Sequence, residues 1–195
     1  MGLLTYNPNF RELGGVDHFV CILGLTDGRV RLHDPAGFPC MSMEFQDFVK
    51  AWEARAISYR RGSFSMWGGF TRVREPTEEE VYREVSSIMR KRYEAGEQGV
   101  IRAYAEAIGS NGMSQQQKQM HQYFSFRLAA ARSLYTARFL AEHDPERAEL
   151  KERIASLFGQ AHLDNLAGDN EALAHTLEGI ADLDDRFREL CVLRG

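Results

Sequence analysis

The segment from Asp17 to Pro35 constrains the fold of this chain most strongly. Two short apolar runs flank Thr26-Asp27-Gly28, and a turn signal between such runs predicts a β-hairpin. With the centre of the hairpin near residue 26, position 18 faces position 34 across the two strands. Because side chains alternate between the faces of a strand, one face is expected to carry His18, Val20, Ile22, Val30, Leu32 and Asp34.

This pattern brings a histidine and an aspartate together on an otherwise apolar surface. A carboxylate beside an imidazole fixes its tautomer and stabilises the imidazolium, which leaves the other ring nitrogen for a nucleophile. His18 and Asp34 are therefore the candidate catalytic residues. A structural interpretation stays open, because a histidine near a strand end usually serves the fold and Asp-Pro commonly ends a strand and starts a turn.

Three stretches in order carry a resemblance to known enzymes: Asp17-His18-Phe19-Val20, then His33-Asp34-Pro35-Ala36-Gly37, then an amphipathic helix with Phe45, Phe48 and Trp52. Together they resemble the C-terminal half of a papain-like domain, as found in bacterial C39-like peptidases and in the butirosin-biosynthesis acyltransferase family. Residues 1–9 also resemble the segment that precedes the histidine in the acyltransferase group. The resemblance covers residues 1–75, and the helical remainder resembles the family's C-terminal domain more loosely.

The resemblance implies a thiol-dependent enzyme in which His18 takes a proton from a cysteine and Asp34 orients the imidazole. Such an enzyme transfers an acyl group from a thioester, for example on an acyl carrier protein, to an amine, or it cleaves peptides. The chain departs from the pattern because no cysteine precedes His18. We therefore expect the nucleophile to come from outside the chain, and the chain alone to be inactive. The alternative is a non-catalytic binding or oligomerisation module with a structural His18–Asp34 pair.

The three cysteines of the chain do not supply that nucleophile. Cys21 alternates to the face opposite His18 and is expected to be a buried filler. Cys40 lies in a turn without a helix N-terminus to lower the pKa of its thiol, and Cys191 is expected to be structural. Three cysteines without metal-ligand spacing also suit a reducing cytosol, so we expect a cytoplasmic protein.

Composition excludes several other classes of function. The net charge of −4 gives no reason to expect a nucleic-acid partner, and no apolar run approaches the ~20 residues of a membrane span. The sequence also predicts neither a cofactor nor a metal site, since it lacks a P-loop and a dinucleotide fingerprint. Four further histidines are scattered without metal-ligand spacing: His121, His143, His162 and His175.

The chain is expected to be an α+β protein with two parts. Residues 1–75 should form a small antiparallel sheet with one packed helix capped by Ser42, and one or two strands within 57–70. Residues 76–195 should form a helical bundle, with capping boxes at Thr77 and Ser114 and a proline-led helix after Asp144. The helix from Ser114 to about Glu142 should be the spine of the bundle, with Phe124 and Tyr135 in the core.

The hairpin face that carries His18 and Asp34 needs a cover. Without one it would expose Val20, Ile22, Val30 and Leu32, and a contiguous apolar surface of that kind promotes association. We therefore expect a homo-oligomer, a missing N-terminal segment, or the helical bundle itself to cover the face.

Overall fold

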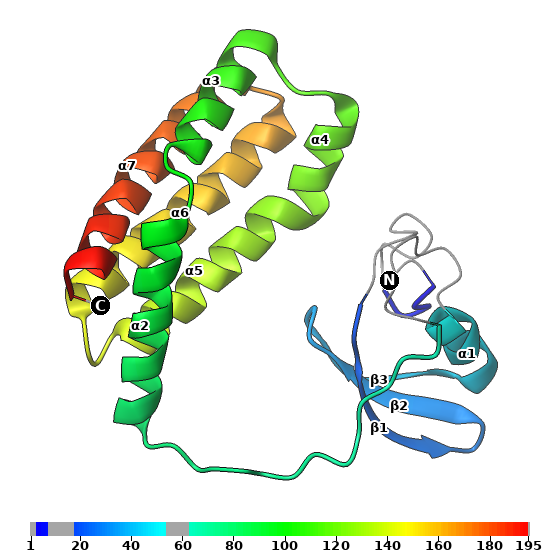
Figure 1. Ribbon diagram of the computed structural model, residues 1–195. Coiled ribbons are helices and arrows are strands. Elements are labelled where there is room, and N and C mark those ends of the chain that lie inside the picture. The colour runs from blue at the N-terminus through cyan, green and yellow to red at the C-terminus, as the bar shows by residue number, and fades with distance from the viewer. Residues whose placement is uncertain (1–2, 8–17, 54–62, 195) are drawn as a thin grey trace. The chain divides into compact units, whose positions relative to one another are not determined.

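The computed structural model describes residues 3–7, 18–53 and 63–194, and these form an α+β protein, as the sequence predicts. The chain divides into two compact units, Met1–Val73 and Arg74–Gly195. Figure 1 shows a small sheet with helix α1 in the first unit and a helical bundle in the second. Each unit is described by itself.

The predicted hairpin forms the first two strands of a three-stranded antiparallel sheet. The strands are β1 (Cys21–Thr26), β2 (Arg29–Asp34) and β3 (Phe38–Glu44), with β2 in the centre. Asp27 and Gly28 connect β1 and β2 with φ angles of 50° and 75°. Positive φ at both residues of a two-residue loop is the geometry that matches the twist of a hairpin, which explains the Asp-Gly sequence.

Two details of this unit differ from the sequence-based expectation. Ser42 lies within β3, and helix α1 (Phe45–Glu53) begins three residues later. Strand β3 was not predicted because Pro39 interrupts its apolar pattern, but a proline is tolerated in an edge strand such as β3. The strands expected within residues 57–70 are not found in 63–70, and 57–62 lie outside the described residues. Residues 1–17, the lead-in that precedes the hairpin, are described only over 3–7.

The core of the first unit covers part of the hairpin face from within the chain. Val30 and Leu32 are 3% and 0% exposed and pack with Leu4 and Met43. Tyr6 from the lead-in and Phe48 from α1 complete the cover. Ile22, in contrast, remains 43% exposed at the edge of the sheet.

The second unit is a bundle of long helices whose starts follow the predicted caps. Thr77 and Ser114 each form a capping box, and Asp144 caps a helix that has Pro145 in its first turn. The elements are α2 (Glu78–Ala95), α3 (Val100–Asn111), α4 (Gln115–Met120), the π-helical turn η1 (His121–Ser125), α5 (Phe126–Leu140), α6 (Pro145–Ala167) and α7 (Asn170–Arg194).

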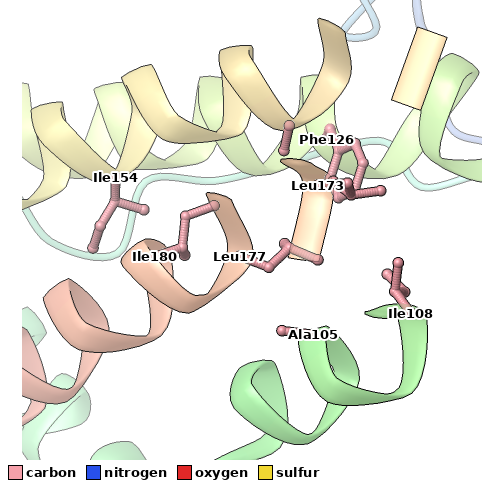
Figure 2. Packing of buried hydrophobic residues seen from close by; sticks show 8 residues of the cluster. Ala105, Ile108, Phe126, Ile154, Leu173, Leu177 and Ile180 are labelled. Atoms are coloured by element: carbon pink, nitrogen blue, oxygen red, sulfur yellow. The ribbon is translucent and has the colours of Figure 1, made fainter. Parts of the chain in front are cut away.

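The main core of the bundle lies between α3, α5, α6 and α7. Figure 2 shows Phe126 of α5 beside Leu173 of α7, with Ile108 of α3 and Ile154 of α6 in the same cluster. A second cluster is centred on Phe187 and Leu140 and includes side chains of α2. The sequence predicts one central helix, from Ser114 to about Glu142. In the structure the buried residues are instead distributed over α5, α6 and α7.

The expected burial of Phe124 and Tyr135 is wrong. Their side chains are 43% and 73% exposed. The π-helical turn η1 inserts an extra residue between α4 and α5, which rotates the apolar stripe by about 100°. The prediction assumed one continuous α-helix through this region. It therefore placed residues on the wrong face of the helix, Phe124 and Tyr135 among them. Among the described residues, none of the helices combines the length and the apolar character needed to cross a membrane.

Candidate His18–Asp34 site

His18 and Asp34 are in contact. The Nε2 atom of His18 lies 2.6 Å from Oδ1 of Asp34. The strand register differs from the predicted one, because Cys21 pairs with His33 and a bulge follows Ile22. His18 therefore precedes β1 and reaches Asp34 diagonally, which a long side chain achieves between neighbouring strands.

The carboxylate of Asp34 is enclosed and fully hydrogen-bonded. Its side chain has 0% exposure, and the His18 side chain 14%. The Ala36 N–H donates to Oδ1 at 2.7 Å, and the Tyr6 hydroxyl donates to Oδ2 at 2.8 Å. The site thus joins the lead-in, the segment before β1, and the turn after β2.

Asp34 is ionised in the folded protein. Burial acts to raise the pKa of its carboxyl, but the hydrogen bonds from Ala36, His18 and Tyr6, with the charge of His18, together hold that pKa below its usual range. The neighbouring Tyr6 shows the reverse effect: burial, its hydrogen bond to Asp34 and the negative charge of Asp34 raise the pKa of the phenol. Tyr6 therefore stays protonated and remains a donor.

The tautomer of His18 follows from this charge state. An ionised carboxylate accepts hydrogen bonds and has no proton to donate, so Nε2 of His18 carries the proton in the 2.6 Å contact. In the neutral imidazole, Nδ1 then holds the free lone pair. The arrangement supplies a base at one defined atom, with a buried negative charge behind it to stabilise the imidazolium.

The supporting groups Tyr6 and Ala36 were not found from the sequence. Tyr6 is 28 residues away from Asp34, and no local pattern connects the two. Ala36 had a recognisable signal, because an aspartate side chain often accepts a hydrogen bond from the N–H two residues later.

The cysteines lie elsewhere. Cys21 is exposed, so its expected role as a buried filler is wrong. Cys40 is also exposed, with φ of 54°, and its N–H donates to Nδ1 of His33 at 2.8 Å. Cys191 is buried, and burial raises the pKa of its thiol despite the neighbouring Arg147. Among the described residues, no three His, Cys, Asp or Glu side chains are placed to hold a metal ion.

The helical unit matches a known protein family. The family model described as "YobF C-terminal domain" matches residues 92–191, from the end of α2 almost to the end of α7. The chain therefore belongs to the YobF C-terminal domain family.

One curated relative matches nearly the whole chain. It is the protein named "Uncharacterized protein YobF" of Bacillus subtilis (strain 168), which is 29% identical over 196 residues. The match covers 96% of this chain and 64% of the relative, so the chain spans slightly less than two thirds of that protein's length. No solved structure matches the chain significantly.

These matches overturn the resemblance on which the sequence analysis relied. Both lead to YobF, and neither leads to C39-like peptidases or to the butirosin-biosynthesis acyltransferase family. The quoted motif is short, and a hairpin that ends in Asp-Pro produces most of it for structural reasons. The His18–Asp34 contact does not depend on that resemblance, because it is observed directly.

Proposed function

We propose that the first unit carries a general base, Nδ1 of His18, for acyl transfer from a thioester, with the attacking thiol supplied from outside the described residues. The observation that carries this proposal is the 2.6 Å contact between His18 Nε2 and a buried, ionised Asp34. Asp34 is the positioning residue in this scheme. The acyl donor is a thioester, either free or held on an acyl carrier protein. The first product is a new thioester on the attacking thiol, and an amine that attacks this thioester yields an amide and releases the thiol.

The chemistry needs two proton transfers at His18. Nδ1 takes the proton of the attacking thiol as its sulfur forms a bond to the carbonyl carbon. The imidazolium, stabilised by Asp34, then returns a proton to the leaving group. General-base assistance of this kind typically contributes about 10²- to 10⁴-fold to a rate.

A test that supplies the nucleophile avoids dependence on an unidentified partner. The full chain is mixed with an acyl-N-acetylcysteamine thioester and excess cysteamine, and transfer to the added thiol is followed by mass spectrometry. We expect acceleration over buffer that is lost about 10²-fold or more in His18→Ala and in the more conservative His18→Gln. Asp34→Asn should reduce the rate and change its pH profile, because the tautomer is no longer fixed.

The control variant is His33→Ala. His33 is in the same hairpin, but its Nδ1 accepts the Cys40 N–H rather than facing Asp34. It should retain the full rate, as should Cys40→Ser. Equal rates for the wild-type chain and both His18 variants, with the fold confirmed by circular dichroism, would refute the proposal.

A second candidate function is a non-catalytic binding or oligomerisation module, in which the His18–Asp34 contact only stabilises the fold of the first unit. The three donors on Asp34 favour it, because they connect segments that would otherwise be held by few contacts. In that case the His18 variants lower the stability and leave thioester exchange unchanged. For the compartment we propose the cytosol, because exposed thiols such as Cys21 and Cys40 suit a reducing environment.

A further inference from the structure

Strand β1 is an edge strand of the sheet in the part of the chain that the structure describes. It pairs with β2 on one side, and the described residues place no strand on its other side. Figure 1 shows β1 at this margin, with β2 between it and β3. The outward N–H and C=O groups of an edge strand are a template on which another strand can pair.

The two edges of the sheet are built differently. Strand β3 carries Pro39, which lacks an N–H, Cys40 in a left-handed conformation, and the charge of Glu44. These are features that block pairing at an edge. Strand β1 reads Cys-Ile-Leu-Gly-Leu-Thr and contains neither a charge nor a proline. Among the described residues, β3 carries three features that block pairing, whereas β1 carries one, the bulge after Ile22.

Apolar side chains gather around the edge at β1. Ile22, Leu23 and Leu25 are 43%, 44% and 59% exposed. Phe19, just before the strand, is 41% exposed and contacts Trp67, which is 61% exposed. At ~200 Å² for a large apolar side chain, this group exposes on the order of 500 Å² before any backbone is counted. A standard interface buries about 800 Å² on each partner, so these side chains alone supply more than half of that area.

We propose that β1 pairs antiparallel with β1 of a second copy of this chain, across a two-fold axis, so that one sheet continues through both copies. A second copy is the occupant that fits best, because an uncharged strand meets itself without like-charge repulsion and a two-fold contact uses the same patch twice. Antiparallel pairing places the start of one strand beside the end of the other. The hairpin turn at Asp27–Gly28 of one copy then lies next to the His18 segment of its partner.

The first test is the oligomeric state of the full chain, measured by sedimentation velocity across a concentration series. We expect a dimer whose dissociation constant rises roughly tenfold or more in Leu25→Lys, because the new charge lies in the paired edge. The matched control is Leu134→Lys on α5, since Leu134 is 52% exposed but lies outside the sheet. A monomeric wild-type chain, or a dimer that Leu25→Lys leaves intact, would overturn the proposal.

The second test uses two native thiols, which lie on opposite edge strands. Cys21 of β1 and Cys40 of β3 are both exposed, so alkylation followed by mass spectrometry reports each edge separately. Alkylation of Cys21 should slow as the dimer forms and recover in Leu25→Lys, whereas Cys40 should react at a constant rate. Slow alkylation of Cys21 in a monomeric sample would show that another segment covers β1, and would also overturn the proposal. Neither test depends on acyl-transfer activity.

Discussion

Asp34 is a carboxylate withdrawn from water and held by three donors from three separate segments. Its stability as an anion depends on all of them, because an unpaired buried charge is costly. The Tyr6–Asp34 hydrogen bond acts on both pKa values: it adds to the effect of burial in raising the pKa of Tyr6, and with the bonds from Ala36 and His18 it lowers the pKa of Asp34.

Tyr6→Phe tests this coupling. Removing the hydroxyl leaves Oδ2 of Asp34 buried without a donor, and the loss of a hydrogen bond to a charged group should cost the first unit about 1.5–3 kcal/mol. The pKa of Asp34 should rise. Denaturant unfolding followed by tryptophan fluorescence measures the cost selectively, because both tryptophans of the chain, Trp52 and Trp67, lie in the first unit.

The comparison for this prediction is Tyr135→Phe, since Tyr135 is 73% exposed on α5. It should change the free energy of unfolding by no more than about 0.5 kcal/mol. A Tyr6→Phe protein as stable as this control would mean that the hydroxyl does not support Asp34.

Period-two alternation predicted that His18 and Asp34 share a face, which holds only because the bulge after Ile22 offsets the odd shift of the two-residue turn. It did not give the register, because the bulge after Ile22 and the two-residue turn shift the pairing. It also gave no indication of Tyr6, because contacts between segments far apart in sequence leave no local pattern. The short motifs around His18 and Asp34 indicated the wrong family for a different reason. They consist of common residues that a hairpin ending in Asp-Pro requires in any family.

At the scale of elements, the bundle is joined by a buried arginine. Arg147 of α6 is 0% exposed, and its Nε donates to Asp144 at 2.8 Å. Its Nη2 donates to the Tyr82 hydroxyl of α2 at 2.9 Å, and its Nη1 lies 3.7 Å from Sγ of Cys191 on α7. One guanidinium thus connects α2, the start of α6, and α7.

Arg147→Met should destabilise the helical unit by about 1.5–3 kcal/mol, because it removes the buried hydrogen bonds to Asp144 and Tyr82 and leaves Asp144 with Arg194 as an ion-pair partner. Arg186→Met is the matched control, since Arg186 is 51% exposed and its ion pairs lie at the surface. Its cost should stay below about 1 kcal/mol. Urea unfolding followed by far-ultraviolet circular dichroism separates the two outcomes, and equal midpoints would contradict the assigned role of Arg147.

Helix starts were predictable where a side chain marks them, as at Thr77, Ser114 and Asp144. The π-helical turn could not be predicted, because the residues His121–Ser125 form no pattern that indicates an extra residue in the helix. Strand β3 was missed because its proline argues against a strand in general and only its edge position makes it acceptable.

For the whole molecule, the shifted pKa values define a pH range of maximum stability. Asp34 in the first unit and Asp144 in the second have pKa values below the usual range, although burial alone would raise both. A lowered carboxyl pKa contributes stability that is present above the unfolded value of about 3.9 and is lost as the pH falls below it. Both units should therefore lose stability in acid below about pH 4.

At high pH the stability is limited by groups whose pKa values are raised in the folded protein. Burial is the main reason that the pKa values of Tyr6 and Tyr93 are raised, so the folded protein disfavours their ionised forms. Stability should begin to fall above about pH 8.5, where the unfolded chain ionises Cys191 first, and fall further above about pH 10, where it ionises the two tyrosines first. Urea midpoints measured from pH 3 to 11 by tryptophan fluorescence and circular dichroism should form a plateau with a decline at each end. A midpoint unchanged across either end would contradict the pKa assignments.

The family match and the candidate site lie in different units of the molecule. Residues 92–191 define the YobF C-terminal domain family, whereas His18 and Asp34 belong to the sheet unit that precedes it. The alignment with YobF of Bacillus subtilis includes both units. Variants at His18 therefore test the chemistry of the first unit without touching the residues that define the family.

The tautomer of His18 tests the central claim most directly, and long-range ¹H–¹⁵N correlation spectra of the imidazole side chains measure it. His175, whose side chain is 90% exposed, provides the reference for a solvent-exposed imidazole in the same sample. We expect neutral His18 to carry its proton on Nε2 alone, and Asp34→Asn to abolish this preference. A proton on Nδ1 of His18, or a tautomer mixture equal to that of His175, would contradict the account.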